Sequence, residues 1–194
     1  WTSGYFSMGY TYSLEDWMIE YEYYDWSNLL TEQDINGMCR DVENGIKAGK
    51  FWHNSPKYQT NWNVFQDFTD LKMSFIWSCF RFLGKEVQIK NIQSWSVMTS
   101  LENEEDRDKL WHHHNHNTAT TTVSGVYYMR LPDDVKELDK AGTELAPTSP
   151  EGEGNFFVPW KTGHWMIYPG KVWHRPGVVQ SMEDRFIVAA DMEF

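Results

Sequence analysis

The sequence predicts a mainly β fold in which N-terminal helices pack on an antiparallel sandwich or barrel. Helical periodicity is confined to residues 1–84, whereas short runs rich in β-branched and aromatic residues fill residues 85–194. Pro- and Gly-containing turns separate these runs, and the sequence holds no internal repeat. Helices followed by short strands are typical of this architecture. A chain of 194 residues fits one domain, and we expect a helical support (1–84) and a β core (85–194).

Three helices are expected in the N-terminal part. The first is predicted over Leu14 to Tyr24. The second begins after Thr31, which is a candidate N-cap with Asp34 at the third helical position, and ends at Gly49. The third is predicted over Val64 to Leu83, where apolar residues recur at helical spacing. These helices are expected to cover one face of the β core.

One long connection interrupts the β core. The stretch Pro132 to Asn155 is rich in Asp, Glu, Pro and Gly, and only Thr143 to Leu145 has the composition of a strand. Connections of this length in a compact domain are often lids over a site. A plain surface insertion is an equally good interpretation, and the sequence leaves both open.

Charge and cysteine content narrow the classes of partner. The formal net charge of −11 repels phosphate backbones and anionic lipid, so no nucleic-acid partner is expected. No apolar run approaches the roughly 20 residues of a membrane span. The two cysteines, Cys39 and Cys79, lie in apolar helical patterns and are interpreted as buried thiols rather than a disulfide, which favours a cytoplasmic location. The chain begins at Trp1 without a leader pattern, and we expect its true N-terminus to lie upstream.

Four of the seven histidines lie in the segment 112–116. Imidazole is a good ligand for divalent first-row metals. In an extended chain residues i and i+2 point the same way, so either His114 and His116 or His112 and His114 can face one metal, and His113 faces away. The other interpretation is a solvated histidine-rich loop. The sequence downstream favours the metal site.

A separate histidine and an arginine follow further along the chain, each at the start of a predicted strand. The segment Gly163 to His174 is predicted to be a strand, a Pro-Gly turn and a histidine at the start of the next strand. Eleven residues later, Arg185 begins an apolar run that reads as a buried strand. A guanidinium there is suited to bidentate binding of a carboxylate. The alternative is a surface ion pair with Glu183 or Asp184.

These features together resemble the Fe(II)/2-oxoglutarate-dependent oxygenases, and most of all their prolyl-hydroxylase-like and aspartyl/asparaginyl-hydroxylase-like branches. The motifs are the His-x-ligand pair, a strand ending in Tyr-Tyr, the distant histidine after a Pro-Gly turn, and the later arginine. The run 124–129, Ser-Gly-Val-Tyr-Tyr-Met, also resembles uncharacterised oxygenases of phage and marine bacteria. The resemblance covers Ile89 to Phe194 and implies a double-stranded β-helix, or jelly roll.

The resemblance implies three metal ligands. His114 corresponds to the first iron ligand of the family and His174 to the distal one. His116 stands where most of the family has Asp, so it either ligates the iron in a three-histidine site or only lines the pocket. A carboxylate from elsewhere in the chain is a further option.

The resemblance also implies residues for the co-substrate. Arg185 corresponds to the arginine that pairs with the far carboxylate of 2-oxoglutarate, and Tyr128 to a tyrosine that hydrogen-bonds the same group. Ser124 lies four residues before Tyr128, on the same face of the predicted strand. The catalytic set is therefore predicted to be the three metal ligands, supported by these three side chains.

The implied function is a hydroxylase that uses Fe(II) and 2-oxoglutarate on a small molecule or a protein side chain. A cupin-type metal enzyme is the second hypothesis, although no Glu follows the His-x-His pair and a cupin gives no role to Arg185. A non-enzymatic jelly-roll binding module is the third. Neither nucleic acid nor membrane is expected as a partner, and a homodimer is left open.

Overall fold

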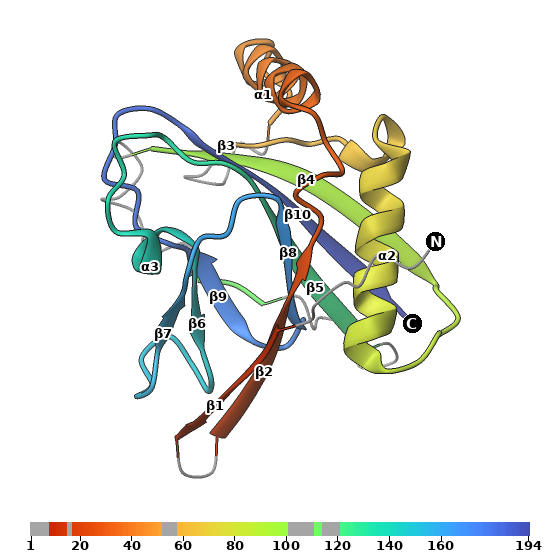
Figure 1. The fold of residues 1–194 in the computed structure, drawn as a ribbon, viewed down its shortest axis with the longest axis vertical. Helices are drawn as coiled ribbons and strands as arrows, with labels where there is room; N and C mark the ends of the chain where they lie inside the picture. The colour runs from red at the N-terminus through yellow and green to blue at the C-terminus, as the bar shows by residue number, and fades with distance from the viewer. Residues whose placement is uncertain (1–7, 15–16, 52–57, 101–110, 114–120) are drawn as a thin grey trace.

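Two antiparallel sheets form the core of the computed structural model, which describes the chain except residues 1–7, 15–16, 52–57, 101–110 and 114–120. The large sheet has the strand order β1-β2-β8-β5-β10-β4-β3 and the small sheet the order β7-β6-β9 (Figure 1). The large sheet consists of β1 (Met8–Leu14), β2 (Trp17–Asp25), β8 (His164–Pro169), β5 (Thr122–Arg130), β10 (Arg185–Glu193), β4 (Asn91–Thr99) and β3 (Tyr58–Gln59). The small sheet consists of β7 (Phe156–Val158), β6 (Thr143–Ala146) and β9 (Trp173–Pro176).

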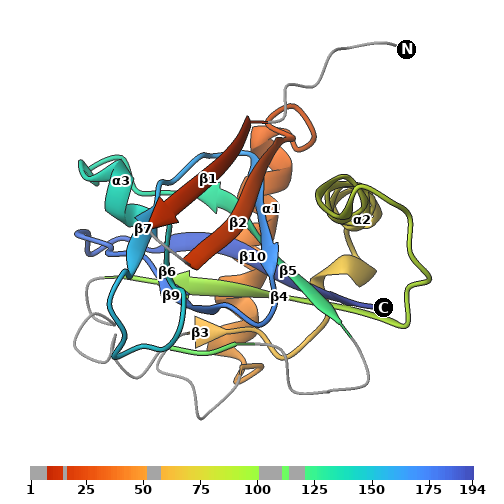
Figure 2. The ribbon, with the colours of Figure 1, turned by 90° about the horizontal axis from the view of Figure 1, so that it is seen from below.

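Alternate residues of the central strands face two different cores. On β5, Tyr127 packs with the helices, whereas Val126 and Tyr128 pack in the space between the sheets. Figures 1 and 2 show α2 (Thr69–Leu83) on one side of the large sheet and the small sheet on the other. The central strands are therefore buried on both faces, which explains their nearly continuous apolar sequence. The predicted mainly β, jelly-roll fold is confirmed.

The predicted helix over Leu14 to Tyr24 is wrong, because this region forms the β1–β2 hairpin. Strand β2 pairs with β8 and extends the large sheet. Its side chains alternate between buried Tyr21 and Tyr23, which pack between the sheets, and the less buried Glu20 and Glu22. This alternation has the period of a strand and not of a helix. Residues 1–84 are therefore only partly helical. They contribute strands to the large sheet in addition to the helices that cover one of its faces.

The other two predicted helices are present. Helix α1 (Glu32–Lys47) begins at Thr31, whose side chain accepts from the backbone of Asp34 in a complete capping box. The third predicted helix begins later than expected, because a 3-10 turn, η1 (Val64–Gln66), precedes α2. Within the part of the chain that the structure describes, no helix is long and apolar enough to cross a membrane.

The connection Pro132 to Asn155 is built into the fold. It contains a short helix, α3 (Leu138–Ala141), and the predicted strand, which is present as β6 and is fully buried. Strand β6 pairs with both β7 and β9 and is the centre of the small sheet. The interpretation of this stretch as a simple surface insertion is therefore wrong for its middle part.

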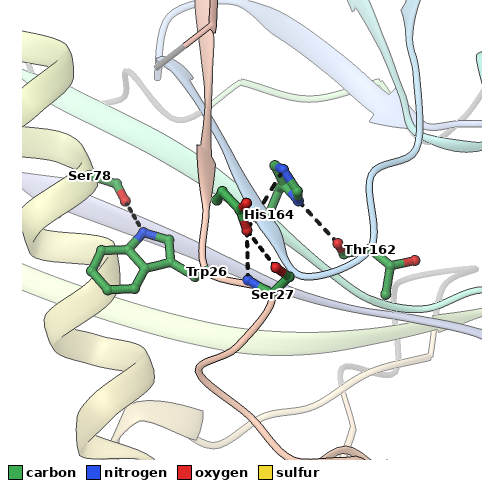
Figure 3. Close-up of polar contacts among 6 residues, drawn as sticks. Trp26, Ser27, Ser78, Thr162 and His164 are labelled. Atoms are coloured by element: carbon green, nitrogen blue, oxygen red, sulfur yellow. Dashed lines mark hydrogen bonds and ion pairs between the residues drawn. The ribbon is translucent and has the colours of Figure 1, made fainter. Parts of the chain in front are cut away.

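Polar contacts fix the end of β2 against its neighbours (Figure 3). Trp26 donates from Nε1 to Ser78 Oγ on α2 at 3.0 Å. At the start of β8, His164 Nδ1 lies 3.0 Å from the carbonyl of Thr162, and its Nε2 lies 4.0 Å from the carboxylate of Asp25. His164 thus has a structural role at the start of β8, and it does not line the hollow described below.

Both cysteines are free, buried thiols, as predicted. Cys39 on α1 and Cys79 on α2 are 1% and 0% exposed. Burial raises the pKa of the Cys39 thiol to about 11, and it raises that of Cys79 well above its usual value. Both therefore act as small apolar side chains in the core between the helices and the large sheet.

Close packing of α2 on the large sheet depends on Gly125. A β-carbon at this position would lie 2.7 Å from Ile167 Cδ1 and 2.8 Å from Phe75 Cε2. We expect Gly125→Ala to reduce the free energy of unfolding by about 1–3 kcal/mol, the usual cost of overpacking. Urea denaturation measures this difference.

The matched control for this prediction is Gly37→Ala, on α1. A β-carbon there meets nothing within 4 Å, so the substitution is expected to stabilise the helix by about 0.5–1 kcal/mol. Equal effects of the two substitutions would contradict the packing account of Gly125.

Candidate functional site

A hollow lies between the two sheets. Counted together with the open solvent at its mouth, it spans about 430 Å³. The large sheet contributes residues of β4, β5, β8 and β10 to its lining, and the small sheet contributes residues of β6 and β9. Two histidines, a buried arginine and a buried aspartate line the hollow together: His112, His174, Arg185 and Asp191. Such a concave site with a few convergent polar groups is the usual form of a small-molecule pocket.

His112 and His174 face each other across the small sheet. Their backbones exchange two hydrogen bonds, from His112 N to His174 O at 3.1 Å and from His174 N to His112 O at 2.9 Å. Directly opposed residues project their side chains to the same face, and the two ring centroids are 4.1 Å apart. The two imidazoles therefore lie side by side at the hollow, where both side chains are within reach of one metal ion.

The orientation of the His174 ring also suits a metal ligand. The ring is 5% exposed, and its Nδ1 lies 3.0 Å from the carbonyl oxygen of Val172. A carbonyl only accepts, so Nδ1 carries the proton and Nε2 keeps its lone pair. Histidine ligands usually donate their second ring N–H to such a backbone or carboxylate acceptor.

The structure places only some of the other histidines in the segment 112–116. His113 packs on Trp173 with ring centroids 4.3 Å apart, so it faces away from the hollow, as predicted. His114 and His116, the two predicted ligands of this segment, lie outside the described residues. The structure brings His112 to His174. Both pairs that the spacing allowed include His114, so the choice between them stays a prediction. Among the described residues no three His, Cys, Asp or Glu side chains cluster as a metal site, so the third ligand is not placed.

Arg185 lies deep in the hollow and is 1% exposed, which excludes a solvated surface ion pair. Its Nη1 donates to the carbonyls of Ala141 at 2.7 Å and Gly142 at 2.9 Å. The guanidinium also lies 5.9 Å from the ring of Trp160. These contacts fix one side of the guanidinium, and the residue contributes to the lining of the hollow. A fixed, buried guanidinium is a strong site for a carboxylate.

Tyr128 lies near the Arg185 end, behind the residues that line the hollow. Its hydroxyl lies 3.0 Å from Thr143 Oγ1, and its ring is 4.7 Å from that of Trp160. Burial raises the pKa of the Tyr128 phenol far above its usual value, against the opposing effects of the Thr143 hydrogen bond and the Arg185 charge. Tyr128 is therefore a neutral hydroxyl near a buried cation, and Thr143 lines the hollow beside it.

Ser124 has a different partner from the one its predicted role requires. Its hydroxyl donates to Asp191 Oδ1 at 2.7 Å, and both side chains are buried. Ser124 lies directly opposite Asp191 in the register of β5 and β10, whereas Arg185 begins β10 at the other end. Ser124 therefore lies away from the arginine, and its predicted contact with the co-substrate stays untested.

Searches against known proteins find similarity only at the level of structure. No protein-family model matches the sequence, and no curated protein matches it. The carbocyclase SnoK from nogalamycin biosynthesis, a non-heme α-ketoglutarate-dependent enzyme, superposes with a TM-score of 0.57 and 12% identity, over 88% of this chain and 79% of SnoK. A prolyl-4-hydroxylase of Pseudomonas putida gives a TM-score of 0.55 and 8% identity, over 90% and 92% of the two chains. The epimerase SnoN, solved with Fe3+ and α-ketoglutarate, gives a TM-score of 0.53 and 11% identity, over 88% and 78%.

The chain has the fold of the Fe(II)/2-oxoglutarate-dependent oxygenases. The resemblance predicted from the sequence is thereby confirmed for the fold. At 8–12% identity to the three structures above, this likeness carries no substrate or reaction by itself.

Several residues that line the hollow were not predicted from the sequence. Arg175 is one of them: it forms a buried ion pair with Glu144, with Nε to Oε2 at 2.8 Å, and its guanidinium packs over Trp111 at 4.4 Å. Thr143 and Asp191 also line the hollow. Strand alternation from Arg185 was the one available signal for Asp191, because residues 185 and 191 fall on the same face.

Three large aromatic residues in the predicted site motifs of the sequence pack elsewhere. Trp165 and Tyr127 pack in the core on the helix side of the large sheet. Trp173 packs on His113, on the face of the small sheet opposite His174. None of the three lines the hollow.

Proposed function

We propose that this chain is an Fe(II)- and 2-oxoglutarate-dependent oxygenase of the hydroxylase class. The observation that carries the proposal is the placement of an opposed histidine pair and a buried arginine in one hollow of the oxygenase fold. The overall reaction is R–H + O₂ + 2-oxoglutarate → R–OH + succinate + CO₂. A cupin-type enzyme has no use for Arg185, so this residue favours the oxygenase.

The residues in the hollow fit an iron ion. His174 presents its Nε2 lone pair because Nδ1 is held by a backbone carbonyl, and His112 lies opposite it. Imidazole is a preferred ligand of Fe(II). We propose His112 and His174 as two ligands and His114, which follows His112 by two residues, as the third; His116 is the alternative third ligand.

The other end of the hollow fits 2-oxoglutarate. Arg185 is held by two backbone carbonyls and carries the charge that a carboxylate needs. Tyr128 supplies a neutral hydroxyl, and Thr143 fixes its position. When bound, iron and 2-oxoglutarate supply the oxidation. The chain's own residues orient the co-substrate through Arg185, hold the His174 imidazole in one tautomer through Val172, and exclude bulk water by burial.

The hydroxyl of Tyr128 is expected to contribute to co-substrate affinity. Tyr128→Phe removes one buried hydrogen-bonding group, and the net value of about 1 kcal/mol corresponds to a roughly fivefold weaker dissociation constant for 2-oxoglutarate. Isothermal titration with Mn(II) in place of Fe(II) measures it. The neighbouring variant Tyr127→Phe, whose ring faces the helices, is the control and should bind as the wild type does. Equal losses in both variants would exclude Tyr128 from the site.

Turnover tests the proposed function directly. Purified protein with Fe(II), 2-oxoglutarate and O₂ is expected to form succinate slowly even without its substrate, and NMR detects the product. His174→Ala is expected to form none. Iron binding without any consumption or binding of 2-oxoglutarate would favour a cupin-type enzyme, and absence of metal binding would favour a binding module.

A further inference from the structure

We propose that Asp191 binds a positively charged group of the substrate, an ammonium or a guanidinium, at the end of the hollow opposite Arg185. This inference rests on the proposed function, because it assigns the substrate class of the same site. Asp191 is 3% exposed, lines the hollow, and has no part in the predicted metal or co-substrate contacts.

The register of the strands orders the groups along the hollow. Arg185 and Asp191 lie six residues apart on β10 with their side chains on one face, which separates them by about 20 Å at roughly 3.3 Å per residue. At the Arg185 end, Tyr128 contacts Thr143, which lies opposite Pro176 on β9. Arg185 is therefore at one end of the hollow and Asp191 is at the other.

His174 lies between these ends. It is two residues from Pro176 along β9, and its ring lies 5.0 Å from that of Tyr168. Tyr168 lies opposite Ser124, and Ser124 lies opposite Asp191. A co-substrate that extends from Arg185 to the histidines leaves the Asp191 end for the substrate.

The chemistry of the Asp191 end suits a cation. A carboxylate presents two oxygen acceptors, and the Ser124 hydroxyl donates to Oδ1 of Asp191. Charges attract more strongly in a buried site than in water. The net charge of −11 adds a general attraction for cationic molecules.

An aromatic wall on the same face supports this assignment. Trp95, on β4, lies opposite Ala189 of β10. It is two residues from Gln93, which lies opposite Asp191. Trp95 lines the hollow and is half-buried, and Gln93 is exposed, so this end is the one that opens toward solvent. An indole that lines the same hollow as a carboxylate can add a cation–π contact to an ammonium or guanidinium group.

A purely structural role is the competing explanation, in which Asp191 only joins β10 to β5 through Ser124. Two variants separate these roles. Asp191→Asn keeps an acceptor for Ser124 and removes the charge, whereas Ser124→Ala keeps the charge and removes the cross-strand hydrogen bond. Asp133→Asn, at an exposed position, is the control for a general loss of one negative charge.

Calorimetric binding to the Mn(II)- and 2-oxoglutarate-loaded protein tests the inference. The probes are Nα-acetyl-lysine amide and Nα-acetyl-arginine amide, compared with the neutral norleucine and citrulline amides, so each pair differs in side-chain charge. We expect at least one cationic probe to bind tenfold or more tightly than its neutral counterpart. Asp191→Asn should abolish this preference, and Ser124→Ala and Asp133→Asn should retain it.

Three results would overturn the inference: equal or absent binding of charged and neutral probes to the wild type, an unchanged preference in Asp191→Asn, or an equal loss in Ser124→Ala. Binding of 2-oxoglutarate is measured on the same wild-type sample, and the probes are also titrated without it. Failure of 2-oxoglutarate to bind would contradict the proposed function. The preference for charged probes would then be judged from the titrations without 2-oxoglutarate. Normal 2-oxoglutarate binding with no charge preference removes only the role of Asp191.

Discussion

Replacing His174 by alanine is expected to abolish tight binding of divalent iron. The ring is buried, its tautomer is fixed by Val172, and it lies opposite His112. Loss of an outer-shell partner alone typically weakens metal affinity 10–100-fold, so loss of a ligand should weaken it by about 100-fold or more. His112→Ala should have an effect of the same order, because the two rings form one pair.

Equilibrium dialysis against Fe(II) under anaerobic conditions, followed by metal analysis, measures this effect. His164→Ala is the matched control, since His164 contacts Thr162 at the edge of the fold and should retain metal as the wild type does. Circular dichroism checks that each variant is folded. Full metal retention in His112→Ala, with loss in His114→Ala and His116→Ala, would restore the ligand pair first predicted from the sequence and exclude His112.

Arg185→Lys is expected to remove most of the affinity for 2-oxoglutarate while leaving metal binding intact. An ammonium keeps the charge but cannot span two carbonyls and also bind a carboxylate in a planar, bidentate manner. Loss of a buried, hydrogen-bonded charge partner costs about 2–5 kcal/mol, which corresponds to at least a roughly 30-fold weaker dissociation constant.

Calorimetric titration of 2-oxoglutarate into the Mn(II)-loaded variant gives this number, and metal content is measured beside it. The control is Arg130→Lys. Arg130 lies at the end of β5 that is close to Arg185, but its guanidinium packs over Phe186 and donates to Asn36, outside the hollow. Unchanged 2-oxoglutarate affinity in Arg185→Lys would show that Arg185 serves the fold alone, through the loop at Ala141 and Gly142.

The parts of the fold that could be predicted are those with strong local signals. The capping box of Thr31 and Asp34 fixed the start of α1, and the apolar run after Arg185 identified β10. The β1–β2 hairpin was missed because its run of Trp, Tyr and Glu has no turn signal and gains its strand conformation by pairing with β8. Tertiary pairing of this kind overrides local propensity.

The candidate site was only partly predictable for a related reason. A run of consecutive histidines offers two equivalent i, i+2 pairs, and the choice depends on the register against His174, which the backbone hydrogen bonds of His112 set. No local pattern contains that register. Asp191 follows the apolar run of β10 and looks like the end of a strand, whereas its neighbours on β5 bury it.

Anaerobic titration of 2-oxoglutarate into the Fe(II)-loaded protein, followed by visible absorption, tests the central claim most directly. A co-substrate that chelates iron held by this hollow produces a metal-to-ligand charge-transfer band. We predict a band that saturates near one equivalent in the wild type, is absent in His174→Ala, and needs much more 2-oxoglutarate in Arg185→Lys. Iron binding without any band at saturating 2-oxoglutarate would contradict the proposal.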